Sequence, residues 1–201
     1  QKGRGGSIFY KIGNCSENLG ELRIACTHLR TAVEMDENLA DAWVGMGVCY
    51  QLQGDYTVGL RYIQKGVEID PENPEYLASL AICQKQAGFP EKAEGTFAKA
   101  TILEPYDQEI WLDFAELFAE RADFAGAMSK IKEGLQNIPE SNLLKWRRIA
   151  LLFLEGKRKE ALSQLNKMLE TDQEGFNQLL EYLPGIYNDP DVLNMRDSFS
   201  L

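Results

Sequence analysis

Residues of similar size and polarity recur at a spacing of 34 along this chain. Four sets keep that spacing: Cys15, Cys49 and Cys83; Phe9, Trp43, Leu77 and Trp111; Gly13, Gly47, Ala81 and Ala115; and Ala25, Gly59, Ala93 and Ala127. A fixed period of this size is the signature of a repeat architecture, in which each unit buries its apolar face against the next. The chain therefore divides into these units: 6–39, 40–73, 74–107, 108–141 and a fifth at 142–172.

Each unit is predicted to fold as two helices. In the second unit, Trp43, Met46, Gly47 and Tyr50 follow the i, i+3, i+4, i+7 spacing of one helix face. Gly54-Asp55 interrupts this pattern, a second apolar pattern follows, and Asp70-Pro71 ends it, because proline cannot continue a helix. In the fifth unit the second pattern comes one residue early, so we expect the turn "EGKRKE" to lack one residue.

Small residues at fixed positions indicate where helix backbones approach closely. The positions equivalent to Gly47, Gly59 and Gly66 hold only glycine or alanine. A glycine inside a helix costs roughly 1 kcal/mol relative to alanine, so its presence needs a reason such as close packing. Gly45 lies on no such set. We expect it to make room for a ligand or an adjacent helix.

The stretch "AWVGMGVCYQLQGDYTVGLRYIQKGVEIDP" resembles the tetratricopeptide repeat family. The residues that carry the resemblance are Trp43, Met46, Gly47, Tyr50, Gly54, Gly59, Ile63, Gly66 and Pro71. The resemblance covers residues 6 to about 170. It implies an all-α, right-handed superhelical solenoid of stacked antiparallel helix pairs, with the first helix of each pair lining a concave groove. Residues 1–5 look like a linker or a frayed end, and the non-repeating 173–201 look like helices that cap the last repeat.

Composition limits the classes of partner. The net charge of −10 argues against nucleic acid and against an anionic membrane surface, both of which attract basic proteins. No apolar run reaches the roughly 20 residues of a membrane span. The four cysteines have no C-x-x-C spacing, and His28 is the only histidine, so we expect no metal, no cofactor and no catalytic group. The three periodic cysteines are expected to be small buried apolar residues, and the cysteines together favour a reducing, cytoplasmic compartment.

Candidate binding residues are those on first helices that avoid the predicted core positions. They are Tyr10, Asn14, Val44, Val48, Leu52, Ile82, Glu109, Leu112, Asp113, Glu116 and Arg147. The apolar members would form a strip in the middle of the groove. Glu109, Asp113 and Glu116 follow one helical stripe together with Glu120. The stripe is either a solvated acidic face or a docking stripe for a peptide with basic and apolar residues.

Charge also separates the fifth unit from the tail. Residues 142–170 are basic and residues 171–201 are acidic. The fifth unit could lie against the tail, or it could offer an anion site at Lys145, Arg147 and Arg148.

These features favour a non-catalytic protein-interaction scaffold that binds a peptide or a helix of a partner protein in its groove. Two alternatives stay open at the level of sequence. The chain could be a structural module that associates with further copies of itself, or the targeting arm of a larger multidomain enzyme or regulator.

Overall fold

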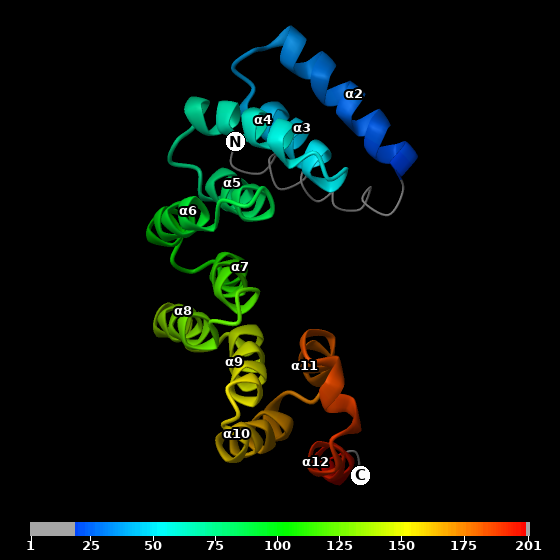
Figure 1. Ribbon diagram of the computed structural model, residues 1–201, viewed down its shortest axis with the longest axis vertical. Helices are drawn as coiled ribbons and strands as arrows, with labels where there is room; N and C mark the ends of the chain where they lie inside the picture. Colours follow the sequence, from blue (N-terminus) through cyan, green and yellow to red (C-terminus); the bar gives the residue numbers. More distant parts are fainter. Residues whose placement is uncertain (1–18, 200–201) are drawn as a thin grey trace. The chain divides into compact units, whose positions relative to one another are not determined.

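The computed structural model describes residues 19–199, and every regular element in that range is helical. The helices are α2 (Leu19–Met35), α3 (Ala40–Leu52), α4 (Tyr56–Ile69), α5 (Pro74–Gln86), α6 (Pro90–Leu103), α7 (Gln108–Ala119), α8 (Phe124–Asn137), α9 (Asn142–Leu154), α10 (Arg158–Thr171), α11 (Phe176–Tyr182), the 3₁₀ helix η1 (Pro184–Asn188) and α12 (Pro190–Phe199). The chain divides into two compact units, Gln1–Glu104 and Pro105–Leu201. Within each unit, consecutive helices pack as pairs, such as α5 with α6 and α9 with α10 (Figure 1). The predicted all-α architecture of stacked helix pairs is confirmed.

Helix boundaries keep the 34-residue spacing through the last repeat. The first helices begin at Ala40, Pro74, Gln108 and Asn142, and the second helices at Tyr56, Pro90, Phe124 and Arg158. The turn between α9 and α10 has three residues, as does the turn between α3 and α4. The prediction that "EGKRKE" lacks a residue is therefore wrong.

The apolar pattern on α9 is displaced for another reason. Trp146 lies one position beyond the place that corresponds to Trp43 and Trp111. Those two residues donate their indole N–H to the backbone carbonyl six residues earlier, whereas Trp146 donates to the Asp172 carboxylate at 2.9 Å. A shift of one residue rotates a side chain by about 100° around the helix axis. The apolar face of α9 is therefore turned toward the tail.

One residue in each turn between paired helices has a positive φ. These residues are Gly54, Gly88, Ala122 and Gly156, again 34 positions apart. The left-handed conformation suits glycine because it has no Cβ to clash with the backbone. Ala122 adopts it at φ 57° and is the only non-glycine residue to do so in the described part of the chain.

The first helices of three repeats begin with equivalent side-chain caps. Asn73 and Asp107 each accept hydrogen bonds from the second and third backbone N–H groups that follow, and Ser141 accepts one from Leu144. Such caps satisfy N–H groups that have no partner inside the helix. They explain why these helices begin in register.

Close contact between α3 and α4 explains the glycines of the second repeat. A Cβ on Gly47 would lie 2.7 Å from the carbonyl oxygen of Gly59, and a Cβ on Gly59 would lie 2.9 Å from that of Gly47. A Cβ on Gly66 would lie 2.3 Å from the Val44 side chain. The predicted close approach at these positions is confirmed.

The tail packs against the fifth repeat. Trp146, Phe176, Leu179, Ile186 and Val192 belong to one buried apolar cluster, and Trp146 meets Phe176 edge to face. Figure 1 shows α11 beside α9 and α12 beside α10, and these pairs are in contact. The tail therefore covers the apolar face that the last repeat would otherwise expose. No helix within 19–199 combines the length and the apolar character that crossing a bilayer requires.

Candidate functional site

Two of the predicted groove residues belong to the interior. Val44 is fully buried and touches the position of Gly66 on α4, and Leu112 is only 6% exposed. Both were predicted to line an open apolar strip, and that prediction is wrong. Their helices carry buried residues on nearly every side, as expected of helices with neighbours on several faces. Gly45 is buried as well, so it does not line an open surface.

The apolar candidates that stay accessible in the first unit are Val48, Leu52 and Ile82. Leu52 is 40% exposed at the end of α3, and Val48 and Ile82 are half-buried. Their helices, α3 and α5, are in contact, and the Tyr76 hydroxyl donates a hydrogen bond to the Asp41 carboxylate between them. We call these three residues the α3–α5 apolar surface. Tyr10 and Asn14 lie outside the described residues.

The acidic stripe of α7 is partly satisfied within the second unit. The Glu116 carboxylate accepts a hydrogen bond from the Arg147 guanidinium of α9 at 2.8 Å. That guanidinium also lies over the ring of Tyr182 on α11, 3.6 Å from its centre. Burial raises the pKa of the Tyr182 hydroxyl to about 12, and Glu116 adds to the rise. These three residues form a polar link between α7, α9 and α11.

The same stripe leaves Glu109 accessible at the start of α7. Partial burial and the neighbouring Asp107 raise the pKa of its carboxyl, while Arg147 acts in the opposite direction. A second cation near Glu109 would favour its charged form. Asp113 is half-buried on the same helix. Glu109 is thus the predicted acidic residue that is most open to a basic group of a partner.

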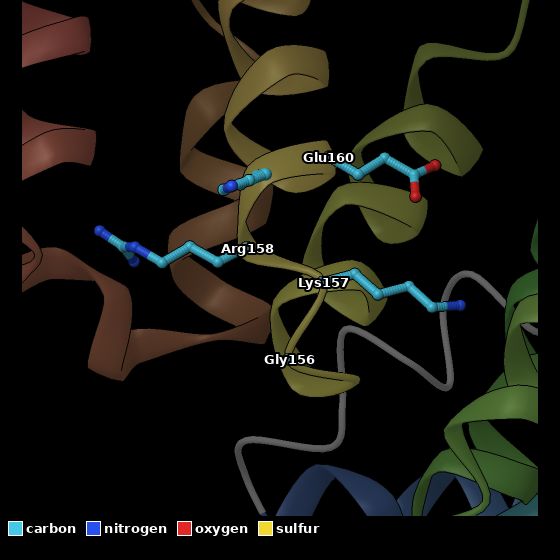
Figure 2. A pocket seen from close by; sticks show the side chains of 5 residues that line it. Gly156, Lys157, Arg158 and Glu160 are labelled. Carbon is cyan, nitrogen blue, oxygen red and sulfur yellow. The ribbon is translucent and has the colours of Figure 1, made fainter.

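The basic fifth repeat contacts the acidic tail through a residue that the sequence did not single out. The Arg158 guanidinium pairs with the carboxylates of Asp189 and Asp191. Arg158 and Lys157 leave the start of α10 in opposite directions (Figure 2), and Lys157 pairs with Glu155 at 2.8 Å. The hollow at this place is lined by five consecutive residues, 156–160, from the turn before α10 and the start of that helix, rather than by converging elements.

Arg147 and Arg148 do not form the anion site considered above. Arg147 pairs with Glu116, and Arg148 donates a hydrogen bond to Gln164 at 2.9 Å. Contact of the fifth repeat with the tail was the other expectation, and the structure bears it out through Arg158. The sequence did not single out Tyr182 as a site residue either, because the pattern of its tail helix predicts only an apolar face.

Three of the cysteines and the histidine lie within residues 19–199. Cys49 and Cys83 are fully buried, and burial raises the pKa of the Cys83 thiol to about 11. His28 is exposed on α2. Within 19–199, no three His, Cys, Asp or Glu side chains lie close enough to hold a metal ion.

Comparison with known families agrees with the repeat geometry. The tetratricopeptide repeat family profile matches residues 6–39 and 40–73, which are the first two units defined above. The chain is a tetratricopeptide repeat protein. Repeats of this family are typically non-catalytic units of protein interaction.

Relatives of this tetratricopeptide repeat protein differ widely. BBSome complex member BBS4 of Bos taurus is 26% identical over 152 residues, which are 76% of this chain and 29% of that protein. Among solved structures, PilF of Pseudomonas aeruginosa superimposes with a TM-score of 0.64 at 16% identity, covering 97% of both chains. YrrB, described as a repeat protein of this family with an unusual peptide-binding site, gives 0.55 at 18% identity over 92% of this chain and 88% of its own. The two structures establish the similarity of fold.

Proposed function

We propose that this chain is a non-catalytic scaffold whose first helices bind an extended segment or a helix of a partner protein. The accessible Glu109 carries the proposal. It is the carboxylate on a first helix whose pKa is raised by its surroundings, so a Lys or Arg of a partner would stabilise its charged form. In the first unit, the α3–α5 apolar surface would bind apolar side chains of a partner in its own right.

Glu109 and the α3–α5 apolar surface would have different roles in binding. Exposed charges at the edge of an interface mainly speed association and select partners, whereas apolar side chains supply most of the binding free energy. Glu109 would therefore steer a basic group, and Leu52 and Ile82 would anchor apolar side chains. Glu116 is excluded from this role because its carboxylate is already held by Arg147.

Selection from a displayed peptide library tests the proposal. The immobilised chain should enrich peptides that combine Lys or Arg with large apolar residues. The affinity of an enriched peptide should fall at least about tenfold for Glu109→Lys and should depend less on salt, because the steering charge is reversed.

Glu140→Lys is the matched control. Glu140 is exposed in the loop between α8 and α9, so Glu94→Lys, which makes the same charge change at an exposed residue of the second helix α6, is measured beside it as a control outside the first helices. Equal losses for all three variants would show that net charge alone controls binding. An unchanged affinity for Glu109→Lys would contradict the assignment of α7 to the binding surface.

A further inference from the structure

The third repeat lacks a tryptophan that its neighbours use to fill one position. Trp43 and Trp111 stand at equivalent places in the second and fourth repeats, and Leu77 occupies that place in the third. Trp43 donates its indole N–H to the Glu37 carbonyl at 2.8 Å, and Trp111 donates to the Pro105 carbonyl at 2.9 Å. The acceptor lies six residues before the tryptophan in both. The residue six positions before Leu77 is Pro71.

A hollow lies where that third indole would be expected. It is lined by Pro71, Leu77, Lys99, Ile102 and Leu103, all from the first unit, and its volume is about 210 Å³. An apolar cavity of roughly 150 Å³ is large enough to admit benzene. The Leu77 side chain is itself 5% exposed, so it forms the floor of the hollow without filling it.

The rim of the hollow differs from the equivalent surface of the fourth repeat. Ile102 is 78% exposed and Leu103 is 41% exposed at the end of α6, whereas the fourth repeat has Gln136 and Asn137 there. Large exposed apolar side chains beside a concave site are typical of binding surfaces. The third repeat therefore combines an unfilled position with an apolar rim.

Lys99 gives the rim a charge. It is exposed and makes no ion pair within residues 19–199. The equivalent lysine of the second repeat, Lys65, pairs with Glu68 at 3.3 Å, and the fourth repeat has Glu133 at this place, paired with Lys130. An acidic residue of a partner would complement Lys99.

We propose that the hollow at Leu77 is a docking site for a tryptophan side chain of a partner protein, next to an acidic residue in the partner's sequence. The indole ring would lie over Leu77 between Pro71 and the rim formed by Ile102 and Leu103. Its N–H would donate to the Pro71 carbonyl, as Trp43 and Trp111 donate within their own repeats. The acidic residue would pair with Lys99. The site uses none of the residues of the function proposed above and does not depend on that function.

Methyl NMR of the full chain with labelled Ile and Leu tests the site. The probe is the dipeptide N-acetyl-Asp-Trp-amide, which should shift the methyl signals of Leu77, Ile102 and Leu103 in a saturable way. N-acetyl-Lys-Trp-amide should bind several-fold more weakly to the native chain, and Lys99→Glu should reverse this preference. Glu109→Lys should leave all of these shifts unchanged.

Leu77→Trp should occupy the hollow from within, so the Ile102 shift caused by the Asp-Trp probe should be lost. Ile102→Glu changes an exposed residue and should weaken the probe at least about tenfold without unfolding the chain. The proposal is wrong if the probe shifts no rim methyl, if a folded Leu77→Trp variant binds the probe as the native chain does, or if Ile102→Glu leaves its affinity unchanged.

Discussion

Single positions in this chain are constrained by the repeat more strongly than by their local sequence. The positive-φ residue of each turn is the clearest case, because three turns use glycine and one uses Ala122. An L-residue in the left-handed region is disfavoured by roughly 1–2 kcal/mol. The fourth repeat therefore folds in spite of an unfavourable residue in its turn.

Replacing Ala122 with glycine should stabilise the protein by about 1 kcal/mol. The gain is smaller than the full steric cost, because glycine also gives the unfolded chain more freedom. Denaturant unfolding of the whole chain measures it. Ala98→Gly, in the middle of α6, should destabilise by about 1 kcal/mol and serves as the comparison. A loss of stability for Ala122→Gly would show that the turn does not need this conformation in solution.

Gly47 illustrates the opposite case, in which a side chain is excluded by its surroundings. A Cβ there would meet the Gly59 carbonyl at 2.7 Å and the Ile63 backbone nitrogen at 2.8 Å, and neither atom can move alone. Gly47→Ala should destabilise by about 1–3 kcal/mol, as overpacked interiors do. Gly95→Ala is the matched control in a helix with open space, and it should stabilise by about 1 kcal/mol. Similar effects of the two substitutions on the unfolding midpoint would contradict the close approach of α3 and α4.

At the scale of helices, the sequence predicts where elements begin better than which face each one buries. The caps, turn glycines and prolines are local signals, so they specify the helix pairs. Val44 and Leu112 show the limit of such signals. A first helix has neighbours on several sides, and an apolar residue outside the main pattern can still be buried between them.

Pairing between helices was the part of the site that local patterns could not specify. The charge pattern identified Glu116 and Arg147 separately, but their contact spans 31 positions and depends on how α7 packs with α9. Tyr182, whose ring contacts the Arg147 guanidinium, lies on a tail helix outside the repeats, so no periodic pattern predicted this contact. The basic character of residues 142–170 did predict contact with the tail, although the residue that makes it is Arg158.

The Arg158 contact makes the attachment of the tail sensitive to acid. The Arg158 guanidinium holds the pKa of Asp189 at about 2, below its ordinary 3.8. A depressed carboxyl pKa contributes stability that is present above about pH 4 and is lost as the pH falls toward 2. Trp146 fluorescence should report this loosening, because its indole packs on Phe176 of the tail.

Arg158→Gln supplies the comparison for that acid titration. The variant should lose little stability at neutral pH, since the Arg158 side chain is exposed to solvent. Its fluorescence should change less between pH 4 and pH 2 than that of the native chain. Identical acid profiles for the two proteins would mean that the ion pair does not hold the tail.

At the scale of the whole molecule, equivalent positions recur on each first helix. At a small number of these positions the side chain departs from the repeated pattern. Glu109, Leu52 and Ile82 are such side chains in the function proposed above, and Leu77 is such a residue in the further site. The chain spans 29% of the length of bovine BBS4. In the functions proposed above, the repeats contribute surfaces for partners.

We propose that partners bind through the first helices. Hydrogen exchange read by mass spectrometry, with and without a peptide selected from the library, is the first measurement to make. Exchange should slow in α3, α5 and α7 and stay unchanged in α4, α6 and α8. Slower exchange confined to the second helices would overturn the proposal, because Glu109 and the α3–α5 apolar surface lie on first helices.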